Sequence, residues 1–255
     1  MEVHHHPHVE KKSFKEYLLE GLMIFLAVSM GFFAESLRET INKHEREQKL
    51  MEMFVEDLKN DTAKLRTVIQ FTNTKKRKLD TLRKLVYAAA EKELDDTLYR
   101  KMYEIYKAWA PNASRFDPTE RTLSQLEKTD AFSFISKQNI SDSILSYKEN
   151  NTFILSQYQM FRDYHQIKAN EVAHTIFSGS LMEGYIENSK ATDLPVRNKK
   201  SSLLTRDRNI LELYGTKLYF VRGIMNIYLT AMEHQKDKAE KLMDLIKKEY
   251  HLENE

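Results

Sequence analysis

The sequence predicts a mainly α-helical protein in which an N-terminal transmembrane helix is followed by a helical bundle. Three observations predict this class. The run from Gly21 to Ala34 carries no charged residue. The 255 residues include six glycines and four prolines, too few for the many tight turns of an all-β fold. In the rest of the chain, apolar residues recur at the spacing of one helix face.

Residues 17–37 are the predicted transmembrane helix. At 1.5 Å per residue this segment is about 31 Å long, which matches a hydrocarbon core of about 30 Å. Glu20 and Glu35 then lie at or just inside the two interfaces. Aromatic residues bracket the segment, as is typical of membrane interfaces: Phe14, Tyr17, Phe32 and Phe33.

Two other interpretations fit the same segment. A cleaved signal peptide would use the lysines of residues 11–15 as its basic region and Ala34-Glu35-Ser36 as its cleavage site. A buried core helix of a soluble protein also tolerates an uncharged run of this length. The helical pattern runs past Ser36 without a turn residue, which favours an anchor over a cleaved signal.

Residues 1–16 form a short polar tail that is rich in histidine. Its candidate metal ligands are His4, His5, His6 and His8, because neighbouring imidazoles can bind nickel, copper or zinc. No carboxylate is fixed beside them as a supporting partner. We therefore interpret residues 1–16 as a solvated tail and expect no bound metal or other cofactor.

Composition excludes several functional classes. The net charge of +2 gives no global electrostatic reason to expect nucleic acid as a partner. The absence of cysteine excludes disulfides, thiolate metal sites, cysteine nucleophiles and a lipoprotein anchor. With 41% hydrophobic residues, the chain after the membrane helix is long enough for one sizeable domain, residues 38–255.

The membrane helix is predicted to continue to about residue 90, because no glycine or proline occurs between Gly31 and Pro111. A near-heptad apolar stripe follows this helix: Leu37, Ile41, Met51, Val55, Leu58, Leu65, Ile69, Leu79, Leu82, Leu85 and Val86. Thr72 and Lys76 interrupt the heptads, so packing within a bundle is favoured over a long parallel coiled coil.

Four places along this helix break the pattern. His44 and Gln48 interrupt the stripe and are predicted to be exposed. Asn60-Asp61-Thr62 is predicted to cap or kink the helix. Lys75-Lys76-Arg77-Lys78 resembles a nucleic-acid patch, but four consecutive basic residues cover every side of a helix, so this turn is predicted to be solvated.

Four further helices are predicted after residue 90. The first starts at a cap at Asp95 or Asp96 and ends at Pro111, and the second starts at Asp117-Pro118-Thr119-Glu120. The third runs from about Ser141 to Gly179, and a linker over residues 183–204 separates it from the last helix, Thr205 to Tyr250. Their predicted inward residues are Leu98, Met102, Ile105, Tyr106, Trp109, Leu123, Leu126, Ile144, Leu145, Ile154, Tyr158, Phe161, Ile167, Val172 and Ile176.

Leu218 to Met232 is apolar enough to suggest a second membrane span. Arg222 lies in its middle and Lys217 just before it, and each would cost about 2.5–3.5 kcal/mol at the bilayer centre. A core helix is therefore the prediction for this segment.

The sequence contains no complete catalytic motif, so we predict that the protein is not an enzyme. Glu171 and His174 form the one Glu-x-x-His motif, whereas di-iron bundles need two such pairs and two further glutamates. Asp163 and His165 lie near His174 and could support acid–base chemistry, but no nucleophile motif accompanies them. We therefore name no catalytic or cofactor-binding residue.

The first 150 residues resemble a known family. The resemblance rests on the anchor, the charged helix EREQKLMEMFVEDLKNDTAKL, Asp117-Pro118, the run RTLSQLEKTDAFSFI (121–135) and Ile140 to Tyr147. This order is similar to a family of uncharacterised single-pass membrane proteins from Bacteroidota. That family often has threonine, leucine and glycine in its middle element, where this chain has Thr122, Leu126 and Thr129-Asp130 without the glycine. The resemblance implies a cytoplasmic N-terminus, a periplasmic helical domain and no known activity.

The membrane helix is predicted to associate with other helices through one face. Ala27 and Gly31 form a small-x-x-x-small pair that lets two backbones approach closely, and Ala34 extends it. Ile24 and Glu20 precede Ala27 on the same side, where a helix interface could shelter the carboxylate. The alternative is that small residues are merely common in membrane helices and that Glu20 reaches the surface. The partner is another copy or a different subunit.

The fold expected from all these features is a transmembrane helix followed by an extracytoplasmic helical bundle. The expected function is a non-enzymatic, membrane-anchored interaction or scaffolding subunit of a cell-envelope complex. An extracytoplasmic sensor or ligand-binding bundle that relays through a partner is the first alternative. A hydrolase or metal-dependent enzyme is the second. Lysines and arginines occur on both sides of the span, so charge does not decide its orientation.

Overall fold

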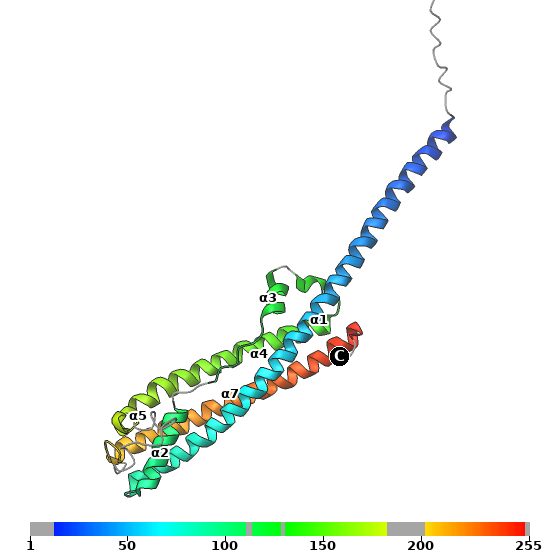
Figure 1. Cartoon of the computed structure of the whole chain (residues 1–255). Coiled ribbons are helices and arrows are strands. Elements are labelled where there is room, and N and C mark those ends of the chain that lie inside the picture. Colours follow the sequence, from blue (N-terminus) through cyan, green and yellow to red (C-terminus); the bar gives the residue numbers. More distant parts are fainter. Residues whose placement is uncertain (1–12, 111–113, 129–130, 183–201, 253–255) are drawn as a thin grey trace, which may run out of the picture. The chain divides into compact units, whose positions relative to one another are not determined.

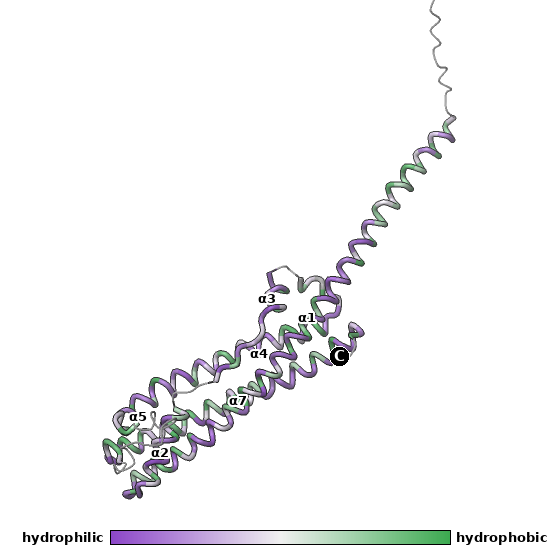
Figure 2. Tube along the Cα trace, in the orientation of Figure 1, coloured by the Kyte–Doolittle hydropathy of each residue, from purple (hydrophilic) through white to green (hydrophobic). Residues whose placement is uncertain are grey.

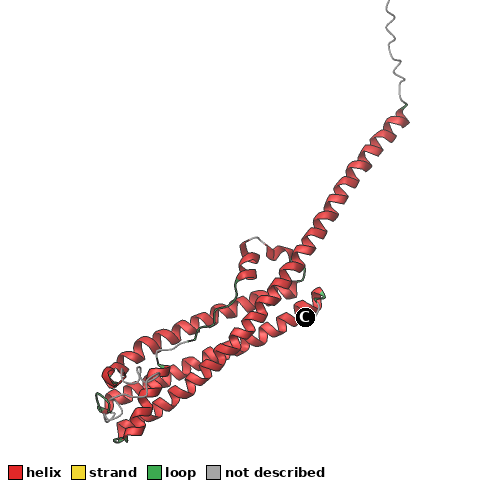
Figure 3. Ribbon diagram, in the orientation of Figure 1, coloured by secondary structure: helices red, strands yellow, loops and turns green. Residues whose placement is uncertain are grey.

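The computed structural model describes residues 13–110, 114–128, 131–182 and 202–252. In chain order these form α1 (Phe14–Glu91), α2 (Asp96–Trp109), α3 (Arg121–Lys128), the 3₁₀-helix η1 (Ala131–Phe134), α4 (Gln138–Arg162), the π-helix η2 (Asp163–Ala169), α5 (Asn170–Ile176) and α7 (Arg208–Tyr250) (Figure 1). The described residues contain no strand, which confirms the mainly α prediction (Figure 3).

The chain divides into two compact units, Met1–Leu50 and Met51–Glu255. The division falls within α1, thirteen residues after the domain boundary predicted from the sequence at 37/38. Residues 14–50 of α1 therefore belong to the first unit, and residues 51–91 of the same helix belong to the second unit.

In the first unit, the apolar part of α1 is uncovered. Figure 2 shows hydrophobic residues along this part of the helix. In the described chain, α1 is the one helix long and apolar enough to cross a membrane, and none of its most apolar 18-residue window is buried. Its lack of burial argues against the core-helix interpretation. A signal sequence would pass the same test of length and composition.

The core of the second unit lies between α1 from Met51, α2, the segment α4–η2–α5, and α7. One cluster is built on aromatic contacts: the Phe177 ring stacks on Tyr106 at 4.3 Å and meets the edge of Tyr214 at 6.1 Å. Figure 1 shows α2 and α5 at the same end of this bundle. A second cluster consists of Leu65, Val68, Phe116, Ile154, Tyr228, Leu229, Ala231 and Met232.

Helices α4 and α7 pack side by side in opposite directions. Asn150 contacts Gln235, the Tyr158 and Tyr228 rings lie 6.0 Å apart, and the Tyr164 ring of η2 lies 6.2 Å from Phe220. On the other flank of α7, Gly215 faces Tyr87 of α1, and a Cβ at this glycine would lie 2.3 Å from the tyrosine ring. Glycine at this position therefore permits the close approach of α1 and α7.

Several predicted boundaries agree with the structure. Asp95 caps α2, because its carboxylate accepts a hydrogen bond from the Leu98 N–H at 2.9 Å. Helix α7 begins at Arg208, after the cap Asp207, and ends at Tyr250. Leu218, Val221 and Met225 are buried, so this stretch is a core helix as predicted. Pro111, Thr129-Asp130 and most of the predicted linker, residues 183–201, lie outside the described residues.

Other predictions are wrong. Helix α1 runs through residues 60–62 without ending, so no cap lies there, and α5 ends at Ile176 rather than at Gly179. Gln48 is half-buried, whereas His44 is exposed as predicted. Four residues assigned to inward faces are exposed: Leu37, Ile41, Leu145 and Ile167. Ile167 lies in the π-helix, whose wider turn changes the helical phase that the prediction assumed.

Candidate functional site

The predicted interface of the predicted membrane helix lies on a part of α1 that no other element of the described structure covers. Glu20, Ile24, Ala27, Gly31 and Ala34 are all exposed, and they follow one another at steps of three or four residues. A Cβ built on Gly31 meets no atom within 4 Å. The face is therefore open to another helix, and its association stays a prediction.

No metal centre is found in the part of the chain that the structure describes. His4, His5, His6 and His8 lie outside the described residues. Within those residues, no group of three or more His, Asp or Glu side chains could hold a metal ion. Glu171 and His174 are exposed on the short α5.

The second unit instead buries a lysine and a histidine. Lys75 of α1, predicted to be solvated, is 1% exposed, and this prediction is wrong. Its Nζ lies 3.5 Å from the Ala110 carbonyl oxygen, to which it donates, and 5.1 Å from the centre of the Phe161 ring. His165 is also 1% exposed and stacks on Phe161 with ring centres 5.4 Å apart. We call Lys75, Phe161 and His165 the buried amine cluster.

Burial controls the charge of this cluster. It lowers the pKa of Lys75 from 10.5 to about 7, since an ammonium loses hydration that an apolar interior does not replace. Burial, and then the nearby charge of Lys75, lowers the pKa of His165 from 6.5 to about 3. At neutral pH His165 is therefore uncharged, and Lys75 is close to half protonated.

The arrangement has two features that are common at functional sites. His165 belongs to the π-helix η2, and π-helical turns within α-helices occur frequently at such sites. The His165 Nδ1 atom is buried without a hydrogen-bond partner in the described structure, as is the Asn170 Oδ1 atom. A partly neutral lysine beside a neutral imidazole can accept a proton or react with a carbonyl carbon.

A second polar cluster joins α1 to α3 and α4. Asp61 Oδ1 accepts hydrogen bonds from the Thr119 N–H and hydroxyl, both at 2.7 Å, and its Oδ2 accepts one from the Tyr147 hydroxyl at 2.8 Å. One turn earlier, Asp57 accepts from the Thr122 N–H at 2.9 Å and lies 2.8 Å from the Arg121 guanidinium. These two carboxylates cap the N-terminus of α3, which favours negative charge.

This second cluster has a structural role. Burial, and then the Asp61 carboxylate, raises the pKa of Tyr147 well above its usual value. Gln235 of α7 is fully buried and donates to the Tyr147 carbonyl at 2.9 Å and to Asn151 Oδ1 at 2.5 Å. Buried polar groups that are paired in this way fix one arrangement of helices. The sequence predicts a cap or kink of α1 at Asp61, whereas its hydrogen-bond partners come from the segment before α3 and from α4.

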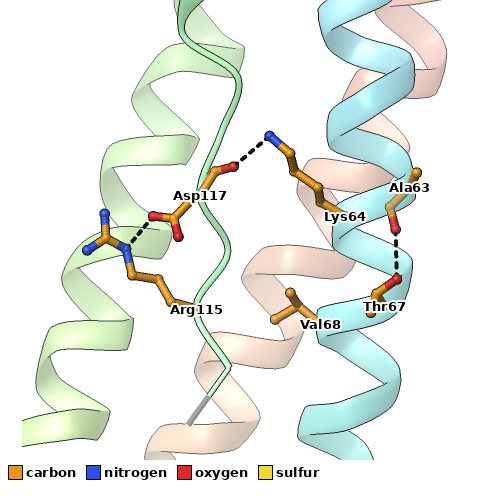
Figure 4. Close-up of a pocket in the computed structure, with 6 residues that line it drawn as sticks. All are labelled: Ala63, Lys64, Thr67, Val68, Arg115 and Asp117. Carbon is orange, nitrogen blue, oxygen red and sulfur yellow. Dashed lines mark hydrogen bonds and ion pairs between the residues drawn. The ribbon is translucent and has the colours of Figure 1, made fainter.

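A surface pocket of about 530 Å³ lies beside this cluster (Figure 4). Its walls are Ala63, Lys64, Thr67 and Val68 of α1 and Arg115 and Asp117 of the segment before α3. Its charged groups already have partners: Lys64 donates to the Asp117 carbonyl at 3.1 Å, and Arg115 forms an ion pair with the Asp117 carboxylate. The pocket therefore offers a ligand little unpaired charge.

Of the residues that the sequence singled out, the structure brings His165 into a buried cluster and leaves Glu171 and His174 at the surface. Comparison of the chain with models of known protein families, with characterised proteins and with solved structures finds no match.

Proposed function

We propose that this protein is a non-enzymatic, membrane-anchored interaction or scaffolding subunit of a cell-envelope complex. Residues 17–37 anchor it in a bacterial inner membrane as a single span, with the N-terminus in the cytoplasm and the helical domain in the periplasm. The orientation follows the family resemblance described above. One observation carries the proposal: the most apolar stretch of α1 has no buried side chain.

The energetics of this stretch favour a membrane environment. Burying one large apolar side chain is worth about 1.5–3 kcal/mol, and this segment exposes many of them, including Leu22, Phe25 and Leu26. At its far end, Glu35 forms an ion pair with Arg38, with 2.6 Å between the charged atoms. A paired carboxylate at the interface lowers the cost of placing this end in the headgroup region.

The second unit supports an interaction role. Its core is filled by large side chains, with Tyr103, Tyr214, Phe54 and Phe116 buried almost completely. It also exposes apolar side chains on the outer faces of α4 and α7, as interaction surfaces do. The partners proposed are lipid and membrane-protein subunits or further copies, and not nucleic acid.

The buried amine cluster favours a second candidate function, a sensor or ligand-binding bundle. A lysine near half protonation at neutral pH responds to small changes in its surroundings. In this candidate function a partner subunit would relay the signal across the membrane.

Cross-linking of the full-length chain in native membranes tests the proposal. Gly31→Leu is expected to abolish cross-links that form between membrane helices, because the added side chain separates the two backbones. Ser29→Leu, on the opposite side of the helix, is the matched control and is expected to leave this association unchanged. A complex that survives both substitutions would show that this face is not the interface.

A further inference from the structure

Helix α7 exposes a second apolar stripe in addition to the one that it buries. Its inner stripe is Leu211, Leu218, Met225 and Met232, which are seven residues apart and buried. Leu213, Phe220 and Ile227 are also seven residues apart, and they are 49%, 52% and 50% exposed. Three residues after each of them lies an exposed, uncharged and small residue: Thr216, Gly223 and Thr230. We call these six residues the α7 seam.

The spacing of the seam predicts the kind of partner. Apolar residues every seven positions, with a second set three positions later, form the contact line of a left-handed coiled coil. The seam therefore fits another α-helix. Gly223 lies in open space, with no atom within 4 Å of a built Cβ, so a partner backbone can approach closely at this point.

We propose that the α7 seam binds the seam of a second copy of this chain, with the two α7 helices parallel. The charges beside the seam select this partner. Glu212 precedes Leu213, and Lys217 follows it by four residues, which are the positions that pair across a parallel coiled coil. Each Glu212 would face Lys217 of the second copy. Three heptads later Lys238 donates to Ser146 of α4 in its own chain and the seam positions are His234 and Asp237, so the seam and its charge pair end before this point. The seam thus complements itself without requiring charges from a different protein.

The neighbouring elements widen the apolar surface. Phe153, Met160 and Ile167 of α4 and η2 are also seven residues apart, and they are 46%, 51% and 54% exposed. Tyr164 of η2 lies with its ring 6.2 Å from that of Phe220, so η2 borders the seam. Two copies anchored in one bilayer with the same topology can pair their α7 helices in parallel, and in this one respect the inference rests on the proposed function.

Single-cysteine cross-linking of the full-length chain in native membranes tests the pairing, because the natural chain has no cysteine. Leu213→Cys, Phe220→Cys and Ile227→Cys are each expected to form a disulfide-linked dimer on mild oxidation. In a parallel pair each of these positions faces its own counterpart. Thr152→Cys, at an exposed position of α4, is the control and is expected to stay monomeric. A dimer at Phe220→Cys alone would indicate an antiparallel pair and overturn the proposal, as would the absence of dimer at all three positions.

A second substitution separates loss of pairing from loss of folding. Gly223→Lys is expected to abolish the Leu213→Cys dimer. It should leave the helical content and thermal melting of the chain unchanged or slightly improved, because the position is open and glycine is a poor helix former. A dimer that persists in this variant would contradict the seam. Failure of the anchor and failure of the seam are distinguishable: dimers from a chain that is not membrane-integral would reject the proposed anchor and keep the seam.

Discussion

Replacing Lys75 by methionine is expected to raise the free energy of unfolding by on the order of 4 kcal/mol at pH 6. The native state holds the pKa of Lys75 at about 7, whereas the unfolded chain holds it near 10.5. Below pH 7 both states carry the ammonium, and only the native state buries it. Methionine fills a similar volume without that cost. Denaturant unfolding of the full-length chain, followed by circular dichroism, measures the difference.

The same shift gives the wild-type protein a pH-dependent stability of defined sign. Between about pH 7 and pH 10.5 the unfolded state binds more protons than the native state, so stability rises with pH. His165 acts in the same direction at lower pH: its native pKa of about 3 lies below the ordinary 6.5, so stability falls as the pH falls through this window.

The Lys75→Met variant is expected to lose the alkaline part of this dependence and keep the acidic part. Lys78→Met, at an exposed position of the same basic run, is the control and is expected to keep both. A Lys75→Met variant that is less stable than wild type at pH 6 would show that the ammonium has compensating partners and that its burial is not a net cost.

Replacing Asp61 by alanine is expected to lower the free energy of unfolding by about 2–4 kcal/mol. The substitution leaves the Thr119 N–H and hydroxyl and the Tyr147 hydroxyl without their shared acceptor at a buried position. The segment before α3 would lose one of its attachments to α1, while the contacts of Asp57 with Thr122 and Arg121 remain. Hydrogen exchange of α3 together with denaturant unfolding measures both effects.

Two further variants sharpen this prediction. Asp61→Asn keeps an acceptor oxygen and is expected to cost less than Asp61→Ala. Asp244→Ala, at an exposed position of α7, is expected to change stability by less than about 0.5 kcal/mol. Equal costs for Asp61→Ala and Asp244→Ala would show that the Asp61 network does not hold α3 in place.

Local signals in the sequence predicted the parts of the fold that local interactions determine. The absence of glycine and proline after Gly31 predicted the long α1, and the carboxylate of Asp95 predicted the start of α2. Both depend on neighbours within one or two helical turns. The mainly α class followed from the same kind of evidence.

Features that depend on distant contacts were not predicted. Four basic residues in a row suggested a solvated turn, yet one of four consecutive helical residues must face the core if the helix stays in a bundle. Lys75 stands four residues before Leu79 and seven before Leu82, so its place in the buried stripe could have been found from spacing alone. The partners of Asp61 lie 58 and 86 residues away and could not have been found in this way.

The interface on the predicted membrane helix was proposed from the sequence alone. The α7 seam, in contrast, could be identified only with the burial that the structure gives. The seven-residue spacing of Leu213, Phe220 and Ile227 is visible in the sequence, but so is that of Leu211, Leu218 and Met225. The burial of the second set and the exposure of the first decide which stripe packs within the chain and which is open to a partner.

The central claim is that residues 17–37 hold the intact chain in a membrane, and alkaline carbonate extraction tests it most directly. Membranes from cells that produce the full-length chain are washed with carbonate. The amount of the chain in the pellet and in the supernatant is then measured, and its N-terminal sequence is determined. We expect the chain to stay in the membrane pellet with residues 17–37 still attached. Release into the supernatant, or a mature N-terminus near Glu35 or Leu37, would contradict it.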